Sequence, residues 1–197
     1  INLLNKHQEK ALDEIKQAFE KKPVTLIHGI TASGKTEIYI HLIDEILKIG
    51  KQALYLVPEI ALTTQIVQRL KNVFGKKVGI YHSKLSSQER VEIWEKVLEF
   101  QTHPEKGYQV ILGARSAVFM PFSNLGLVIV DEEHENSFKQ FDPAPRYNAR
   151  DMAVILGLQN KAKVLLGSAT PSFETYYNAI TGKYGLVNLT KRHSNIE

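Results

Sequence analysis

The stretch Gly29-Ile30-Thr31-Ala32-Ser33-Gly34-Lys35-Thr36 has the spacing of a phosphate-binding loop, with a glycine at each end and a Lys-Thr pair to close it. An apolar run over residues 24–27 precedes it, and residues 37–47 follow with apolar side chains at helical spacing. Glycines let the backbone turn tightly and leave amides free to meet phosphate oxygens, and the start of a helix favours an anion. The sequence therefore predicts a nucleotide site between a strand and a helix.

Each position of this loop has an expected role. Lys35 is expected to reach the β- and γ-phosphates of ATP, and Thr36 to offer its hydroxyl to Mg²⁺. The remaining residues expected to line the nucleotide are Gly29, Thr31, Ala32, Ser33 and Gly34. The alternative is a flexible Gly/Ser loop that contains a lysine by chance, which ordinary residue frequencies allow in about 1% of chains of this length.

The composition favours one soluble domain. The chain has 197 residues, 43% of them hydrophobic and 23% charged, and no apolar run approaches the ~20 residues of a membrane span. The absence of cysteine excludes disulfides and zinc-thiolate sites and fits a reducing cytoplasm. A net charge of +4 permits an anionic partner but is common among cytosolic enzymes. The start at Ile1, without Met or a signal pattern, indicates a piece of a longer protein.

Strand and helix patterns alternate along the chain. Helices are predicted over residues 4–19, 37–47, 60–74, 87–100, 148–158 and 172–181, with a short turn or helix at 114–119. Strands are predicted over residues 24–27, 52–57, 77–81, 108–112, 125–130, 163–167 and 184–189. Ser86 and Glu89 are placed to form a capping box. Because the strands are apolar on both faces, we predict an α/β fold with a mostly parallel sheet and helices on both faces.

A second part of the site is expected where the apolar run 127–130 ends in Asp131 and Glu132. A buried strand would deliver both carboxylates to the edge of the sheet where the phosphate-binding loop lies. Asp131 is expected to hold Mg²⁺, and Glu132 to orient or deprotonate the attacking water. A strand that ends in a solvated acidic turn is the alternative, and the nearby phosphate loop favours the catalytic interpretation. His134 could connect this site to Ser168 at the end of a later strand.

The motifs together resemble a known family. The phosphate loop, Asp131-Glu132-Glu133-His134 and Ser168-Ala169-Thr170 occur in the order of the first three motifs of superfamily 2 helicases. Four further stretches resemble the PriA family of bacterial replication-restart DNA helicases: Val57-Pro58-Glu59-Ile60-Ala61-Leu62-Thr63-Thr64-Gln65, Tyr81-His82-Ser83, Gly113-Ala114-Arg115-Ser116-Ala117-Val118-Phe119 and Gly167-Ser168-Ala169-Thr170-Pro171.

This resemblance implies that residues 1–197 form a single RecA-like P-loop NTPase domain, the first helicase lobe. It implies ATP and Mg²⁺ as cofactors and a contact between Gln8 and the adenine. A second lobe with an arginine finger, a zinc module and a DNA-end-binding domain are expected outside this chain, so zinc is expected only there. Expected partners are single-stranded and forked DNA, the second lobe and replication-restart proteins. The expected location is the bacterial cytoplasm, in association with the nucleoid and with no membrane contact.

The segment from His134 to Asp151 interleaves aromatic rings with cations, a composition that suits single-stranded nucleic acid, because rings stack on bases and cations meet phosphates. Core packing by Phe138 and Phe141 is an equal alternative. The family resemblance extends the candidate nucleic-acid contacts to Thr63, Gln65, His82, Ser83, Arg115, Ser116, Phe138, Lys139, Phe141, Arg146, Tyr147 and Arg150.

Two other functions compete with a helicase lobe. A nucleotide kinase would need an acceptor pocket and an arginine-bearing lid, and the motifs at 131–134 and 168–170 are not expected in it. A nucleic-acid-binding module with a vestigial nucleotide site would have no need for intact Lys35, Thr36, Asp131 and Glu132.

Overall fold

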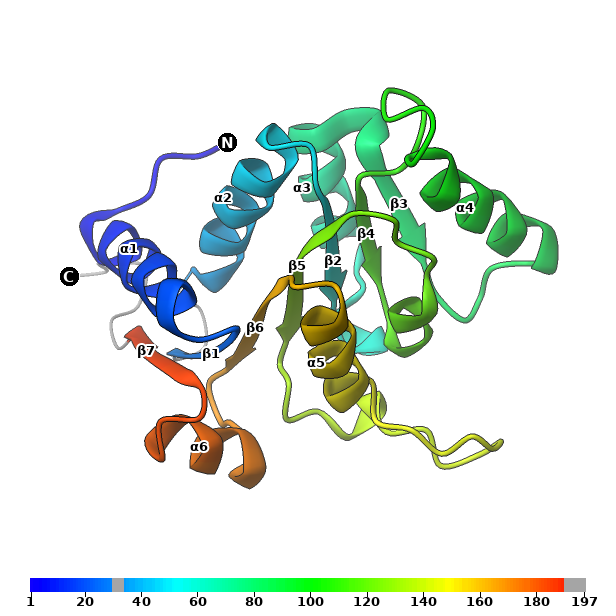
Figure 1. Cartoon of the computed structure of the whole chain (residues 1–197). Coiled ribbons are helices and arrows are strands. Elements are labelled where there is room, and N and C mark those ends of the chain that lie inside the picture. The colour runs from blue at the N-terminus through cyan, green and yellow to red at the C-terminus, as the bar shows by residue number, and fades with distance from the viewer. Residues whose placement is uncertain (30–33, 190–197) are drawn as a thin grey trace.

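The computed structural model describes residues 1–29 and 34–189, and their strands form one sheet (Figure 1). The sheet has seven strands in the order β3-β4-β2-β5-β6-β1-β7, and every neighbouring pair is parallel. The strands are β1 (Val24–Gly29), β2 (Gln52–Leu56), β3 (Val78–Tyr81), β4 (Val110–Gly113), β5 (Leu125–Asp131), β6 (Lys163–Ser168) and β7 (Gly185–Leu189).

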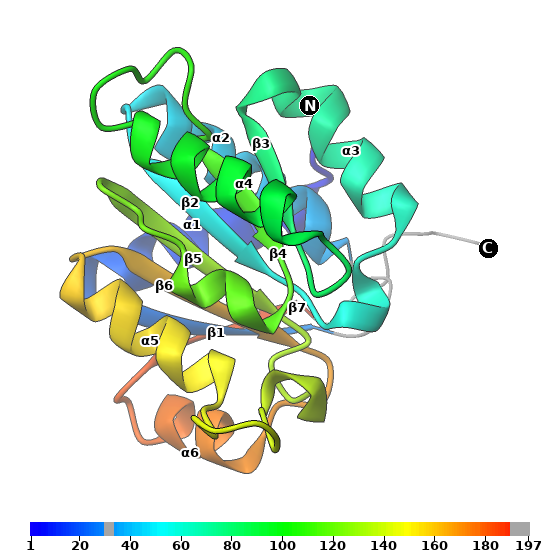
Figure 2. The same cartoon turned by 90° about the vertical axis from the view of Figure 1, so that its right-hand side faces the viewer.

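Helices cover both faces of the sheet (Figure 2). The α-helices are α1 (Lys6–Lys21), α2 (Lys35–Lys48), α3 (Thr64–Phe74), α4 (Ser87–Glu99), α5 (Ala149–Gln159) and α6 (Phe173–Ile180). The 3₁₀ turns are η1 (Glu59–Ala61), η2 (Gly75–Lys77), η3 (Arg115–Phe119) and η4 (Asn136–Phe138). One hydrophobic core lies under α1, α2 and α3, and a second contains buried residues of α4, α5 and α6. The predicted fold class is therefore confirmed.

Alternation within the strands builds these two cores. Leu54 and Leu56 of β2 belong to the core under α5, whereas Tyr55 between them belongs to the core under α2. Successive strand residues point to opposite faces, so a strand that is buried on both faces must be apolar throughout. All five residues of β2 are buried. This burial explains the continuous apolar runs in the sequence.

One predicted boundary is wrong. A helix was expected over residues 60–74, but the chain forms η1 first and α3 begins only at Thr64. Thr63 has an extended backbone, and its hydroxyl accepts a hydrogen bond from the Ile66 amide at 3.5 Å, so it acts as the N-cap. The predicted capping box of α4 is confirmed, because Ser86 and Glu89 exchange side-chain and backbone hydrogen bonds.

The parallel sheet brings the sequence motifs together. The carboxyl ends of all its strands lie at one edge, so the segments that follow β1, β2, β3, β4, β5 and β6 share that edge. Those segments contain the phosphate loop, the acidic segment and the Ser-Ala-Thr motif. Within the described ranges, no helix has both the length and the apolar character needed to cross a bilayer.

Candidate active site

Lys35 lies at the centre of the site. It is the first residue of α2 and is buried, and its ammonium donates a hydrogen bond to the Gly29 carbonyl at 2.9 Å. The same nitrogen lies 3.9 Å from Glu132 Oε1. Gly34 precedes it with φ of 82°, a left-handed conformation that favours glycine. The predicted loop residues Thr31, Ala32 and Ser33 lie outside the described residues.

Gln8 supports the end of the phosphate loop. Its side-chain oxygen accepts a hydrogen bond from the Asn5 amide at 2.9 Å, and its side-chain nitrogen donates to the Gly34 carbonyl at 3.1 Å. The residue is completely buried. The side chain therefore joins the capping box of α1 to the end of the phosphate loop. Its contact with the adenine stays a prediction.

Two buried tyrosines hold Asp131 at the end of β5. The Tyr39 hydroxyl donates to one carboxylate oxygen at 3.1 Å, and the Tyr55 hydroxyl donates to the other at 3.3 Å. Burial, followed by the charge of Asp131, raises the pKa of both tyrosines well above the usual value, so both hydroxyls stay protonated as donors. A Cβ on Gly167 would lie 1.9 Å from the Tyr39 hydroxyl, so a glycine at 167 makes room for this contact.

The Asp131 carboxylate is poorly solvated. Burial raises its pKa from 3.8 to about 6, and the charge of Glu132 adds to this effect against the opposing charge of Lys35. A carboxylate that is costly to ionise gains from a nearby cation. After burial and the charge of Asp131, the Thr36 side chain has a smaller, opposite effect on the Tyr55 pKa, so Thr36 lies close to the tyrosine that binds Asp131.

This donor set fits Mg²⁺. The ion prefers hard oxygen ligands and keeps several waters, so one hydroxyl and one carboxylate from the protein suffice. In the described part of the chain, no group of three or more His, Cys, Asp or Glu side chains is placed to hold a metal ion. Thr36 and Asp131 stay the predicted Mg²⁺ ligands.

Glu132 lies between a cation and a histidine. One carboxylate oxygen is 3.9 Å from Lys35 Nζ, and the other is 3.7 Å from His134 Nδ1. Its backbone has φ of 48°, a left-handed conformation that non-glycine residues rarely adopt. Such backbone strain persists only where surrounding contacts impose it, and it is frequent at active sites.

His134 joins the acidic segment to β6. Its Nδ1 lies 2.6 Å from the Ser168 hydroxyl, which also accepts a hydrogen bond from the Thr170 amide at 3.0 Å. The connection expected from the sequence between His134 and the Ser-Ala-Thr motif is present in the structure.

Sequence reasoning gave Glu133 no role, yet it is the most buried acid of the segment. Its carboxylate accepts hydrogen bonds from the Ser172 amide at 2.7 Å, the Ser172 hydroxyl at 3.0 Å and the Thr175 hydroxyl at 2.9 Å. Arg150 at the start of α5 donates to it at 3.3 Å. Glu133 therefore connects the acidic segment to α5 and to α6.

A model of the DEAD/DEAH box helicase family matches residues 5–179. This chain belongs to the DEAD/DEAH box helicase family. The helicase motifs recognised in the sequence thus lie within a family match that covers most of the chain, and this match favours a helicase lobe over a nucleotide kinase.

Several curated relatives are similar over nearly the whole chain. "Replication restart protein PriA" of Chlamydia trachomatis is 46% identical over 194 residues, which are 97% of this chain and 25% of that protein. The protein of the same name from Bacillus subtilis is 44% identical over 96% of this chain and 23% of its own length. The predicted resemblance to PriA is confirmed, and the chain spans about a quarter of the length of these relatives.

Solved helicase structures share the fold. RecG bound to a three-way DNA junction superposes with a TM-score of 0.65 at 22% identity, over 100% of this chain and 25% of that one. The Hef helicase domain of Pyrococcus furiosus gives 0.65 at 17% identity, over 93% and 37% of the two chains. Because these identities are low, the structures show the RecA-like helicase fold alone.

The predicted nucleic-acid residues fall into two groups in this helicase lobe. The first group is solvent-exposed and consists of Thr63, Gln65, Ser83, Phe141 and Arg146. Thr63 and Gln65 also line a cavity of about 510 Å³ together with Thr36 and Arg69. The Ser83 hydroxyl is hydrogen-bonded to Glu59. Their contacts with DNA stay predictions.

The second group is partly or fully engaged within the protein. Arg115 donates to the Lys139 carbonyl at 3.0 Å, and Lys139 donates to the Arg146 carbonyl at 3.2 Å. Tyr147 makes an edge contact with Phe119 at 4.8 Å between ring centres. His82 and Ser116 are half-buried.

Two of the nucleic-acid predictions need correction. Phe138 is only 1% exposed and belongs to the core under α5, so core packing, the alternative considered above, describes it. Arg150 is also turned inward, where it is paired with Glu133 and Asp151 and donates to the Ser172 hydroxyl at 2.8 Å. A base or a phosphate would have to displace these contacts to reach either side chain.

Proposed function

We propose that this chain is the ATP-binding motor lobe of a replication-restart DNA helicase. Together with a second lobe, it would couple hydrolysis of Mg²⁺-ATP to translocation on single-stranded DNA. The observation that carries the proposal is the convergence of Lys35, Glu132 and His134 at the carboxyl edge of a parallel sheet, where His134 meets Ser168.

The proposed chemistry assigns one task to each side chain. Lys35 would bind the β- and γ-phosphates, in place of its present contact with the Gly29 carbonyl. Thr36 and Asp131 would hold Mg²⁺, which when bound would neutralise charge on the phosphate oxygens. Glu132 would orient the attacking water and accept its proton, because a carboxylate within hydrogen-bond reach of water can act as a base. His134 would connect Glu132 to the Ser168 motif, because it lies close to both side chains.

The proposed partners follow from the family and the relatives. Single-stranded and forked DNA would cross the edge formed by Thr63, Ser83 and Phe141, and replication-restart proteins would assemble with the longer enzyme. We place that enzyme in the bacterial cytoplasm, in association with the nucleoid.

Paired substitutions test the proposal in a protein that carries this chain together with the second lobe. Lys35→Ala should impair both nucleotide binding and turnover. Glu132→Gln should retain Mg²⁺-ATP binding while turnover falls by roughly 10²–10⁴, the usual worth of a catalytic base. Nucleotide affinity by calorimetry and steady-state ATPase rates separate the two steps. Normal turnover by Glu132→Gln would remove Glu132 from the water-activating role.

A further inference from the structure

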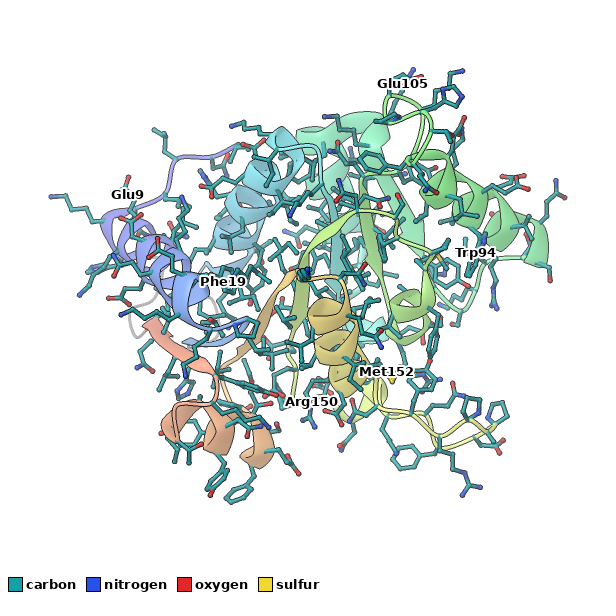
Figure 3. The ribbon with its side chains drawn as sticks, viewed as in Figure 1. Glu9, Phe19, Trp94, Glu105, Arg150 and Met152 are labelled. Carbon is teal, nitrogen blue, oxygen red and sulfur yellow. The ribbon has the colours of Figure 1, made fainter. Side chains whose placement is uncertain are left out.

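Helix α4 has a stripe of apolar side chains on a side that faces solvent rather than the core. Val97 is the only residue of α4 that is fully buried. Val91, Trp94 and Leu98 are 54%, 42% and 43% exposed, and their spacing of three and four residues places them along one side of the helix. A surface helix ordinarily directs its apolar stripe into the protein, so a stripe that faces solvent marks an interaction surface. Figure 3 marks Trp94 on this outlying helix.

An acidic groove lies beside the stripe. Its volume is about 630 Å³, and apolar side chains of Leu85, Ile93 and Tyr108 contribute to its lining. The charged residues that line it are Glu89, Glu92, Glu95, Lys96 and Glu99. Helical spacing places these glutamates on the flank next to the stripe.

Two of the four glutamates are available for a cationic partner. Glu99 is paired with Lys96 at 2.5 Å, and Glu89 accepts hydrogen bonds from Ser86 in the capping box. Glu92 accepts a long hydrogen bond from Gln88 at 3.4 Å. Within the described residues, neither Glu92 nor Glu95 belongs to an ion pair.

The charge of this surface selects against nucleic acid. The chain as a whole has a net charge of +4, but α4 carries four glutamates against one arginine and one lysine. DNA phosphates would be repelled here, whereas lysine and arginine side chains would be attracted. A partner that matches both the stripe and the groove is therefore apolar along one side and basic along the next.

The position of α4 favours a separate protein as that partner. Helix α4 lies beside β3, one edge strand of the sheet, whereas β7 forms the other edge. Asn2, near the start of the chain, is hydrogen-bonded to His41 of α2, on the face of the sheet opposite to α4. Neighbouring strands lie about 4.8 Å apart, so a segment that follows β7 would have to cross roughly 30 Å of sheet to reach α4. A segment that precedes Asn2 would have to pass around an edge of the sheet to the other face.

We propose that α4 and its groove form a docking surface for a basic amphipathic helix of a separate protein. Apolar side chains of that helix would cover Trp94 and Leu98, and its lysines and arginines would face Glu92 and Glu95. Trp94 would be the anchor of the contact, since tryptophan is enriched among residues that dominate interface affinity. This surface is distinct from the nucleotide site and does not depend on it.

Photo-crosslinking identifies what covers the stripe. A benzoylphenylalanine at position 94, introduced in the cells that make the protein, should crosslink to a segment of another protein with basic and apolar residues at helical spacing. The control carries the same group in place of Leu158, an exposed apolar residue of α5, and should not crosslink to that segment. Crosslinks to a second copy, to the same polypeptide, to an acidic segment or to nothing would overturn the proposal.

Fluorescence then measures the contact in the 197-residue chain, because Trp94 is its only tryptophan. A synthetic copy of the crosslinked segment should shift the Trp94 emission to the blue. The Glu92→Lys/Glu95→Lys variant should bind that peptide at least about tenfold more weakly, with unchanged melting temperature and Mg²⁺-ADP affinity. The matched control, Glu9→Lys/Glu20→Lys on α1, makes the same charge change at exposed positions elsewhere. An equal loss in the control would reduce the effect to overall charge and overturn the proposed site.

Discussion

The acidic segment (residues 131–134) and the loop tip (residues 140–147) differ in how their side chains are held. In the acidic segment, Asp131 meets two tyrosines, Glu133 meets three donor residues and His134 meets Ser168. In the loop tip, Phe141 is 67% exposed and Arg146 is also exposed. The tip is held at its base, where the Gln140 amide donates to the Tyr147 carbonyl at 2.8 Å, and the Gln140 side chain donates to the Pro143 and Pro145 carbonyls.

This difference separates two kinds of function. Chemistry on a phosphate requires groups whose geometry is set before the substrate arrives, and buried hydrogen bonds supply that geometry. Contact with single-stranded nucleic acid requires exposed rings and cations that can follow the strand. Substitutions in the acidic segment should therefore change stability and chemistry together, whereas substitutions in the loop tip should change binding alone.

The largest expected effect comes from removing the contacts of Glu133, which anchor the acidic segment. Glu133→Ala should lower the free energy of unfolding by about 3–5 kcal/mol, because it leaves Arg150 buried without this partner and frees the donors of Ser172 and Thr175. Urea unfolding of the 197-residue chain measures it. The control Glu135→Ala removes an exposed acid and should stay within about 0.5 kcal/mol. Equal stability of the two variants would contradict the anchoring role.

The second prediction concerns the unfavourable free energy of ionising the buried Asp131 carboxyl group. Its folded pKa of about 6 lies above the ordinary 3.8, so the folded state binds the proton more tightly. Without nucleotide or metal, stability should therefore fall as pH rises from about 4 to 6, by roughly 3 kcal/mol in total. Asp131→Asn cannot ionise, so it should lose this slope and be more stable than the parent above pH 6.

The same variant should lose Mg²⁺-dependent nucleotide binding, since the amide supplies no charge to the ion. Unfolding at pH 4, 6 and 8 gives the slope, and titration with ADP in the presence and absence of Mg²⁺ gives the second readout. If Asp131→Asn kept the parent's dependence of stability on pH, a group other than Asp131 would be its cause.

The alternation of apolar runs predicted the sheet, the helices on both faces and most element positions. Strand β2 is buried throughout and β5 is buried as far as Val130, so their sequences had little freedom. The start of α3 was missed because apolar spacing continues through Ile60 and Ala61, whereas the turn depends on the conformation of Leu62 and the cap at Thr63.

The motifs predicted the candidate catalytic residues but not their supports. Tyr39 and Tyr55 are buried core residues, and sequence spacing cannot show that both hydroxyls donate to Asp131. Phe138 and Phe141 lie three residues apart in a segment without periodicity, so the sequence could not decide that one is buried and the other exposed. Such assignments depend on long-range packing.

The third prediction concerns the exposed ring of Phe141 at the loop tip. Phe141→Ala should weaken binding of single-stranded DNA by about 1–3 kcal/mol, the worth of one stacked base, while melting temperature stays constant. Fluorescence anisotropy with a labelled oligonucleotide measures the affinity. Phe138→Ala is the contrast, because truncation of a buried aromatic costs about 3–5 kcal/mol of stability. Unchanged DNA affinity in a stable Phe141→Ala protein would remove the tip from the DNA path.

The smallest expected effect concerns the cations of the same loop. Exposed Arg146 is free to meet a phosphate through its guanidinium, whereas Arg115 donates to the Lys139 carbonyl. Each phosphate contact on a single strand contributes about 0.7 to the slope of log affinity against log salt. Arg146→Ala should therefore weaken binding of all sequences alike and reduce that slope by about 0.7. Arg115→Ala should leave the slope unchanged but lower affinity through a looser loop base. Affinities measured at four or more salt concentrations distinguish the two, and the opposite assignment of slopes would place Arg115, rather than Arg146, against the DNA backbone.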